Sequence, residues 1–356
     1  MSETVTKTDL LSMNVAELEE FCRSIGEPKF RAGQIFKWMH AGVGFDGMSN
    51  LSKALREKLN ETAVLLYPEI AEKYVSAQDG TVKYLWELSD GQNIESVFMR
   101  YHHGNTICIS TQAGCRMGCA FCASTLGGKV RDLTPSEMLG QVIAAQRDMG
   151  ERISGIVLMG IGEPLDNYDN VMKFLRLVGD EAGLNIGYRH ISLSTCGLVD
   201  GIDRLAEEGM PVTLSISLHA PTDALRSEIM PINKKWNIAE LLSASVRYFE
   251  KTGRRISFEY TLIAGKNDTA EGAAQLVQTM KKYVGRKMPI HINLIPVNPI
   301  KERDFASSDM GNVRRFAAIL EKNGMTATVR RTLGPDINAS CGQLRNRENQ
   351  IQKQIL

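Results

Sequence analysis

From residue 105 onward the chain alternates strand-like and helical runs, and this alternation constrains the fold more than any other feature. The clearest helix between two strands begins at Thr134, where Pro135 and Glu137 complete a capping-box start signal. Parallel strands joined through helices form α/β architectures, and six such units predict a partial (β/α)6 barrel with its ligands at the carboxyl ends of the strands. The strand-like runs are residues 106–111, 153–159, 190–195, 212–218, 256–262 and 290–295, with a later one at 326–330.

The N-terminal part of the chain predicts a small helical domain over residues 1–75. Asn14 is followed three residues later by Glu17, the spacing of a capping box, and an amphipathic run comes next. A third helix is expected to begin at Ser49 or Asn50. This accessory domain carries Lys29, Arg31, Lys37 and Lys53, and it would either contact nucleic acid or only pack against the barrel.

Between the helical domain and the barrel the hydrophobic period changes to two. Asp90-Gly91 separates two runs of alternating hydrophobicity, which is a strong hairpin signal. The sequence therefore predicts a β-hairpin linker over residues 76–104. The barrel is expected over residues 105–345, and a C-terminal tail over residues 346–356.

Three thiols stand close together directly after the first barrel strand. Cys115, Cys119 and Cys122 have C-x3-C-x2-C spacing. Thiolate sulfur favours iron–sulfur clusters or zinc, but structural zinc takes a fourth protein ligand, and no Cys or His follows in the next sixty residues. On a four-iron cube, three cysteines leave one iron open to coordinate a small molecule. The spacing therefore predicts a cluster that takes part in chemistry, with a zinc knuckle as the alternative.

Composition and charge limit the classes of protein to consider. The 356-residue chain has seven cysteines, an odd number, and no apolar signal segment at its N-terminus, which predicts a soluble cytoplasmic protein with metal or redox chemistry and no structural disulfides. No long apolar run indicates a membrane span. The net charge of +1 does not by itself indicate RNA binding. Basic pairs that a folded surface could gather on one face are Lys234-Lys235, Arg254-Arg255, Lys281-Lys282, Arg286-Lys287, Arg314-Arg315 and Arg330-Arg331.

The cysteine spacing, with the aromatic Phe121 before the third thiol, resembles the signature of radical S-adenosylmethionine (SAM) enzymes. The rest of the chain resembles a narrower family, the RlmN/Cfr family of RNA adenosine methyltransferases. Within this family, the RlmN type is favoured by Gly162-Glu163-Pro164-Leu165 and by the loop at 122–128. The motifs that carry this resemblance follow one another in family order: Met159-Gly-Ile-Gly162-Glu163-Pro164, Ser215-Ile-Ser217-Leu218-His219-Ala220, Met230-Pro-Ile-Asn233, Asn293-Leu-Ile-Pro-Val-Asn298-Pro299 and Ala339-Ser-Cys341-Gly342-Gln343-Leu344.

The resemblance implies two cofactors and the residues that hold them. In the family, cysteines matching Cys115, Cys119 and Cys122 ligate a [4Fe–4S] cluster, and SAM chelates the fourth iron. An external one-electron reductant, such as a flavodoxin, feeds the cluster, which cleaves SAM to a 5′-deoxyadenosyl radical. The residues that match the SAM contacts of the family are Gly162, Glu163, Ser194, Ser217, Leu218, His219 and Asn298.

Two further thiols and a carboxylate complete the reaction that the resemblance implies. Cys341 is methylated by one SAM, and a radical from a second SAM removes a hydrogen atom from that methyl group. The resulting methylene radical adds to adenine and gives a covalent protein–RNA intermediate. Cys108 then attacks Cys341 to release the product as a transient disulfide forms, and Glu95 accepts the ring proton. The two thiols therefore have to approach within disulfide distance.

The implied activity is methylation of C2 of one adenosine in 23S rRNA and in certain tRNAs, by a chain expected to be a monomer. The base has to leave its stack to reach a buried radical, so the substrate is expected to present it in an unpaired loop. The nearest alternative is Cfr-type methylation of C8 of the same rRNA base, which gives antibiotic resistance. An alternative from another class is a non-catalytic RNA-binding protein with an Fe–S or zinc site, which would not need Cys341.

Overall fold

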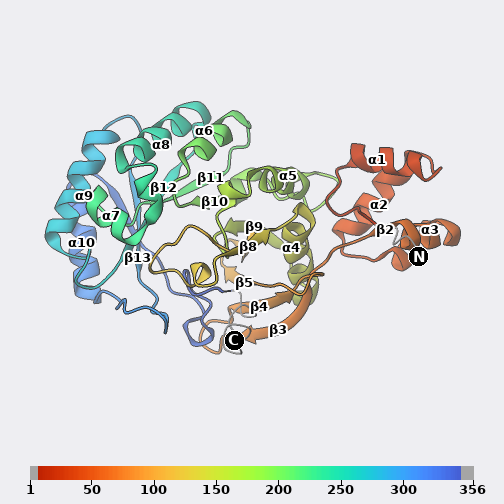
Figure 1. Ribbon diagram of the computed structural model, residues 1–356, viewed down its shortest axis with the longest axis horizontal. Coiled ribbons are helices and arrows are strands. Elements are labelled where there is room, and N and C mark those ends of the chain that lie inside the picture. Colours follow the sequence, from red (N-terminus) through yellow and green to blue (C-terminus); the bar gives the residue numbers. More distant parts are fainter. Residues whose placement is uncertain (1–6, 346–356) are drawn as a thin grey trace.

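The computed structural model describes residues 7–345, and most of them surround one ten-stranded sheet (Figure 1). In order across the sheet its strands are β14 (Thr326–Val329), β13 (His291–Pro296), β12 (Ile256–Leu262), β11 (Thr213–Ser217), β10 (Ile191–Thr195), β9 (Ile153–Leu158), β6 (Gly104–Cys108), β5 (Asn93–Tyr101), β4 (Val82–Glu87) and β3 (Glu69–Val75). Neighbours from β14 to β6 pair in parallel, and those from β6 to β3 pair antiparallel. The strands β14 and β3 are the two edges, so the barrel stays open.

The predicted partial barrel is confirmed, because every strand-like run from residue 106 onward corresponds to a parallel strand of this sheet. All seven residues of β12 are buried, as expected for a parallel strand that has helices on one face and barrel side chains on the other. The hairpin signal at Asp90-Gly91 is also confirmed, since β4 and β5 pair antiparallel across it. The hairpin continues the barrel sheet through the pairing of β5 with β6.

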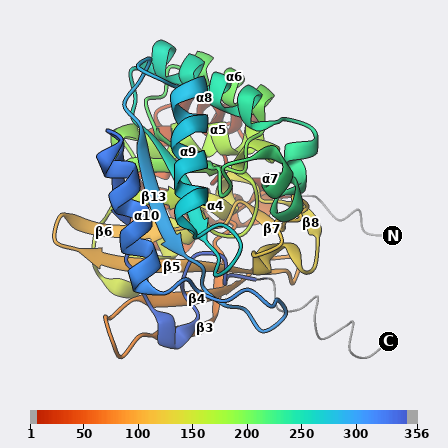
Figure 2. The same cartoon turned by 90° about the vertical axis from the view of Figure 1, so that its left-hand side faces the viewer.

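Helices cover the outer face of the parallel strands, as Figures 1 and 2 show from two directions. The capping box at Thr134 and Glu137 is present, with both reciprocal hydrogen bonds. Within residues 7–345, no helix has the length and apolar character needed to cross a membrane. The barrel helices are α4 (Pro135–Met149), α5 (Tyr168–Gly179), α6 (Val199–Glu207), α7 (Asp223–Ile229), α8 (Ile238–Thr252), α9 (Ala270–Tyr283) and α10 (Met310–Lys322).

A lobe of short helices lies at one end of the molecule (Figure 1). The predicted capping box of Asn14 and Glu17 begins α1. The expected start of the third helix at residue 49 or 50 was wrong. Ser52 caps this helix through Leu55, while the Asn50 side chain accepts from Trp38 Nε1 at 2.7 Å and is not available as a cap. The helices are α1 (Val15–Ser24), α2 (Arg31–His40) and α3 (Lys53–Thr62).

The expectation of helices up to residue 75 was wrong after α3. The chain continues into β2 (Ala63–Val64), which pairs in parallel with β1 (Thr8–Asp9), and then into β3 at the edge of the large sheet. Almost every residue of β3 is exposed, so the strand has no buried face that would require apolar residues at alternate positions. Its sequence therefore lacks the alternating pattern from which a half-buried strand is predicted.

His40 joins the helical lobe to the barrel. Its ring is buried and lies against Phe36, with 4.1 Å between ring centroids, and its Nδ1 accepts from the Leu184 amide at 3.3 Å. Burial lowers the pKa of His40 from 6.5 to about 4. The imidazole is therefore neutral in the folded protein at pH 7.

We expect this histidine to make stability depend on pH. Because its folded pKa is below its unfolded pKa, its contribution is fully present above pH 6.5 and is lost as the pH falls toward 4. Between pH 7.5 and pH 5 the free energy of unfolding should fall by about 2 kcal/mol on its account. Urea unfolding of the wild type and of His40→Asn, whose amide oxygen can also accept from Leu184, measures the effect. The same pH dependence in both proteins would contradict it.

Candidate active site

The carboxyl ends of the parallel strands surround a cavity that opens to solvent. Ligands of βα barrels bind at this end of the strands. The structure thus brings together residues that lie more than two hundred positions apart in the sequence. Predicted site residues that line this first cavity are Cys115, Cys119, Cys122, Gly162, Glu163, Ser194, Ser217, His219, Asn298 and Cys341.

The loop that carries the three cysteines begins at a turn that requires glycine. Gly114, the last residue of β7 (Gln112–Gly114), has a φ of +77°, and a Cβ there would lie 1.9 Å from the carbonyl oxygen of Gly128 on the chain leading into β8 (Lys129–Asp132). This close approach fixes where Cys115 leaves the sheet. Cys119 then packs among apolar side chains that include Ile229 and Val297.

The thiols of Cys115, Cys119 and Cys122 fit an iron–sulfur cluster. Burial raises the pKa of all three and brings that of Cys115 to about 12, so a bound cation is needed to keep them as thiolates at neutral pH. Among residues 7–345, no three Cys, His, Asp or Glu side chains are arranged to hold a single metal ion. A four-iron cube binds each thiolate through a different iron, and so it does not require the sulfurs to converge on one point.

Glu163 presents a fixed carboxylate to the first cavity. Gly162 before it has a φ of +110°, and a Cβ there would lie 2.7 Å from the Gln112 side chain. The buried Glu163 accepts the Cys196 amide at 2.7 Å and the Leu165 amide at 3.1 Å. Burial raises its pKa, and these amides oppose the shift. A carboxylate held in this way can still accept from a cationic amino group.

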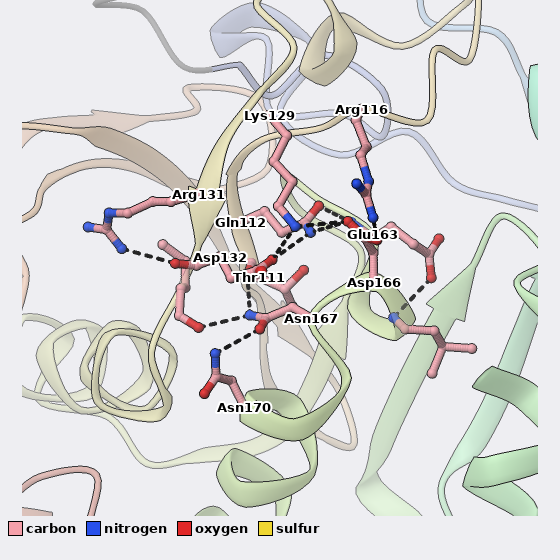
Figure 3. Close-up of polar contacts among 12 residues, drawn as sticks. Thr111, Gln112, Arg116, Lys129, Arg131, Asp132, Glu163, Asp166, Asn167 and Asn170 are labelled. Atoms are coloured by element: carbon pink, nitrogen blue, oxygen red, sulfur yellow. Dashed lines mark hydrogen bonds and ion pairs between the residues drawn. The ribbon is translucent and has the colours of Figure 1, made fainter. Parts of the chain in front are cut away.

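Asp166 ties the cysteine loop to the turn that carries Glu163 (Figure 3). Its carboxylate accepts from Lys129 Nζ at 3.0 Å and from Gln112 Nε2 at 2.9 Å, and it forms an ion pair with Arg116, the residue after the first cysteine. The Gln112 Oε1 atom in turn accepts from the Glu163 amide at 2.9 Å. The cluster loop and the Glu163 turn are therefore one connected unit.

Removing the charge of Asp166 is expected to loosen this unit. Asp166 is 6% exposed and accepts from Lys129, Arg116 and Gln112, so Asp166→Asn weakens three contacts at once and should lower the free energy of unfolding by about 2 kcal/mol, although Lys129 keeps its ion pair with Asp132 at 2.7 Å. Urea unfolding and faster hydrogen exchange over residues 111–132 measure the loss. Asp203→Asn is the matched control, since it breaks an exposed pair with Arg247 and should cost less than about 1 kcal/mol. Equal costs would refute a special role for Asp166.

His219 has an unusual backbone and a defined tautomer. Its φ is +56°, a region that residues other than glycine rarely adopt. Its Nδ1 accepts from the Thr261 amide at 2.9 Å, and burial lowers its pKa to about 3, so the neutral ring carries its proton on Nε2. Phe121 of the cysteine loop packs edge-on against the ring at 4.9 Å. His219 thus offers a hydrogen-bond donor at the wall of the first cavity.

One predicted contact, Leu218, does not line the cavity. Its side chain is fully buried in the core, and its carbonyl accepts from Arg226 Nε at 3.1 Å. The same guanidinium, itself fully buried, also donates to the carbonyls of Ser217 and Cys196 at 3.0 and 2.7 Å. Arg226 therefore holds the ends of β10 and β11 in place. The sequence gives no sign of this, because an arginine on a short helix is normally solvated.

Cys341 and Cys108 both line a second cavity. Cys341 lines both cavities, and Asn298 Nδ2 donates to its carbonyl at 3.0 Å. All seven cysteines of the chain are free, so the expected Cys108–Cys341 disulfide is not present in the structure. Its transient formation stays a prediction.

Glu95 is buried and lines neither cavity. Its Oε2 accepts from the Arg345 amide at 2.9 Å, and its Oε1 lies 3.5 Å from Lys83 Nζ. The end of the Cys341 segment therefore covers the predicted proton acceptor. For Glu95 to reach an adenine bound near Cys341, residues 344–345 would have to shift.

Comparisons with known proteins agree with this geometry. Residues 8–65 match the family model described as the ribosomal RNA large subunit methyltransferase N-terminal domain, and residues 109–277 match that of the radical SAM superfamily. The chain is 53% identical over 342 residues to the probable dual-specificity RNA methyltransferase RlmN of Lachnospira eligens, covering 96% of each chain. The chain belongs to the RlmN family. The predicted family is thereby confirmed.

Further relatives support membership of the RlmN family. The corresponding probable dual-specificity RNA methyltransferase RlmN of Clostridium perfringens is 54% identical over 339 residues, covering 95% of this chain and 96% of that protein. The crystal structure of a radical SAM methyltransferase from Sphaerobacter thermophilus has a TM-score of 0.88 and 43% identity, covering 95% of this chain and 99% of that one. As a radical SAM enzyme, this RlmN family member uses a [4Fe–4S] cluster and SAM.

The structure adds a charged pair to the predicted RlmN site. Arg330 lines both cavities, lies 3.9 Å from Glu259 on β12, and approaches the sulfur of Met159 at 3.6 Å. Glu259 is itself held by Ser257 and Asn293 at 2.8 and 2.7 Å. The sequence marks Arg330 only as half of a basic pair, and nothing marks Glu259, which lies inside a strand whose seven residues are all buried.

Proposed function

We propose that this RlmN-family enzyme methylates C2 of an adenosine in 23S rRNA and in certain tRNAs. The observation that carries the proposal is the position of Cys341, which lines both the cavity of the cluster cysteines and the cavity of Cys108. A methyl carrier needs this position, because its sulfur has to face a methyl donor first and the RNA base afterwards. The relatives named as dual-specificity RNA methyltransferase RlmN support RNA as the substrate, and their name favours the RlmN-type assignment, C2, over the Cfr-type assignment, C8.

The residues of the first cavity would hold both cofactors. Cys115, Cys119 and Cys122 would bind the cluster, and Glu163 would accept the amino group of SAM. Ser194, Ser217, His219 and Asn298 would supply further polar contacts. When bound, these cofactors supply a methyl group and a 5′-deoxyadenosyl radical. We further propose that the enzyme works as a monomer in the cytoplasm with an external one-electron reductant.

The thiols and Glu95 perform the transfer. Cys341 carries the methyl group as a thioether and would give one of its hydrogen atoms to the 5′-deoxyadenosyl radical, and the methylene radical left on its sulfur forms a carbon–carbon bond to C2 of adenine. Glu95 accepts the proton from that carbon, and the unpaired electron of the adduct would return to the oxidised cluster. Cys108 then attacks the sulfur of Cys341, so a sulfur–sulfur bond forms as the carbon–sulfur bond breaks, and the released carbon takes up a proton to become the methyl group. Burial raises the pKa of Cys108 to about 12, which keeps this thiol protonated before the adduct forms.

Nucleoside mass spectrometry tests the proposed function. The full chain is reconstituted anaerobically with iron and sulfide and incubated with SAM, a reductant and transcripts of 23S rRNA or tRNA. The expected product is 2-methyladenosine. Formation of 8-methyladenosine would replace the proposal by Cfr-type chemistry, and bound but unmodified RNA would favour a non-catalytic protein.

A further inference from the structure

The two cavities differ in charge although they share a wall. Glu163 and Glu259 line the first cavity. The second cavity is lined by Arg330 and Arg331, and no Asp or Glu is among the described residues that line it. The first cavity thus suits a ligand with a cationic end, as SAM has, and the second suits a ligand with a phosphate.

The second cavity also has an aromatic wall. Tyr101, at the end of β5, lines it and is 36% exposed. Its ring stacks on the exposed His103, with 5.2 Å between centroids and 14° between planes, and His102 meets His103 edge-on at 5.0 Å. Proteins bind unpaired bases by stacking them on exposed aromatic rings of this kind.

Tyr101 and the two arginines surround the sulfurs that do the transfer. Cys108 and Cys341 both line the same cavity, and Arg330 reaches from it into the first one. Arg331 is exposed at the outer side of the pair. A base that enters here would reach Cys341 through the cavity that the cluster cysteines do not line, while the exposed Arg331 is available to its phosphate.

On the basis of the proposed function, we propose that the second cavity binds the target nucleotide of the RNA. The Tyr101 ring stacks on the extruded adenine, and the Arg331 guanidinium pairs with an adjacent phosphate. Tyr101 and Arg331 are thus RNA-binding residues, and they separate the RNA site from the SAM site on the two sides of Cys341. The exposed His103 extends the stack toward the neighbouring nucleotide.

RNA affinity and Cys341 methylation, measured separately, test this assignment. The probe is a fluorescent RNA hairpin with the target adenosine in its loop, titrated by anisotropy onto the anaerobically reconstituted full chain. We expect Tyr101→Ala to weaken binding about tenfold and Tyr101→Phe to bind nearly as the wild type does. Arg331→Ala should weaken binding and reduce the slope of log affinity against log salt concentration by about one. Tyr283→Ala and Arg286→Ala, which line neither cavity, are the matched controls.

Mass spectrometry of Cys341 after incubation with SAM alone provides the second readout. If the second cavity serves RNA, Tyr101→Ala methylates Cys341 at the wild-type rate. Wild-type affinity for RNA in both Tyr101→Ala and Arg331→Ala would overturn the assignment, as would a loss of Cys341 methylation equal to the loss of RNA affinity. Failure of the proposed function itself would look different, because the wild type would then leave Cys341 and the RNA unmethylated whatever the affinities of the variants.

Discussion

Replacing Cys341 by alanine is expected to reduce RNA methylation to background. Cys341 lies between the two cavities, and no other thiol lines both of them and is exposed. Without its sulfur there is no atom to carry the methyl group, and direct displacement on SAM fails because C2 of adenine is itself electrophilic. Quantifying 2-methyladenosine in RNA treated with the reconstituted enzyme measures the effect.

The matched control for Cys341→Ala is Cys22→Ala, which removes a buried thiol of the helical lobe. Iron and sulfide content should be unchanged in Cys341→Ala, since the three cluster cysteines are intact. A Cys341→Ala protein that still methylates RNA would rule out a cysteine-bound methyl carrier. Absence of methylation in both the wild type and the variant would instead favour a protein that only binds RNA.

Replacing Cys108 by alanine is expected to trap the enzyme on its substrate. Cys108 lines the second cavity with Cys341, so its sulfur is placed to break the bond between Cys341 and the methylated base. Without it, the adduct forms but is not resolved. A denaturing gel should show RNA covalently attached to the Cys108→Ala protein after a single turnover, and far less attached to the wild type.

The double variant Cys108→Ala, Cys341→Ala is the control, and it should give no attached RNA. Release of free methylated RNA by Cys108→Ala at the wild-type rate would mean that another group resolves the adduct. Nuclease digestion of the attached RNA leaves the bound adenosine on the protein. Peptide mass spectrometry should then locate this adenosine on Cys341.

The order of the barrel strands could be predicted because each strand leaves a local signal. The parallel strands are short apolar runs between capped helices, and β4 and β5 flank an Asp-Gly turn. The edge strand β3 could not, since its exposed charged residues have no periodicity. The start of α3 could not be predicted either, because it depends on a tertiary contact. Trp38 donates a hydrogen bond to the Asn50 side chain, so Ser52 caps the helix instead.

In the candidate site, too, some residues could be predicted from the sequence and others could not. The cysteine motif and Glu163 have fixed spacings that the sequence shows directly. Asp166 and Arg226 do not, because their importance comes from burial and from partners far away in the chain. The position of Glu95 under Arg345 likewise follows from how the last segment folds back, which no local pattern contains.

Transfer of a labelled methyl group from Cys341 tests the central claim most directly. Cys341 is first methylated with SAM that carries a trideuterated methyl group, excess SAM is removed, and one turnover on RNA is run with unlabelled SAM. The account predicts 2-methyladenosine that keeps two of the three deuterium atoms, because the methyl group loses one hydrogen before it bonds to carbon. Unlabelled 2-methyladenosine would contradict it, since the methyl group would then come from SAM without passing through Cys341.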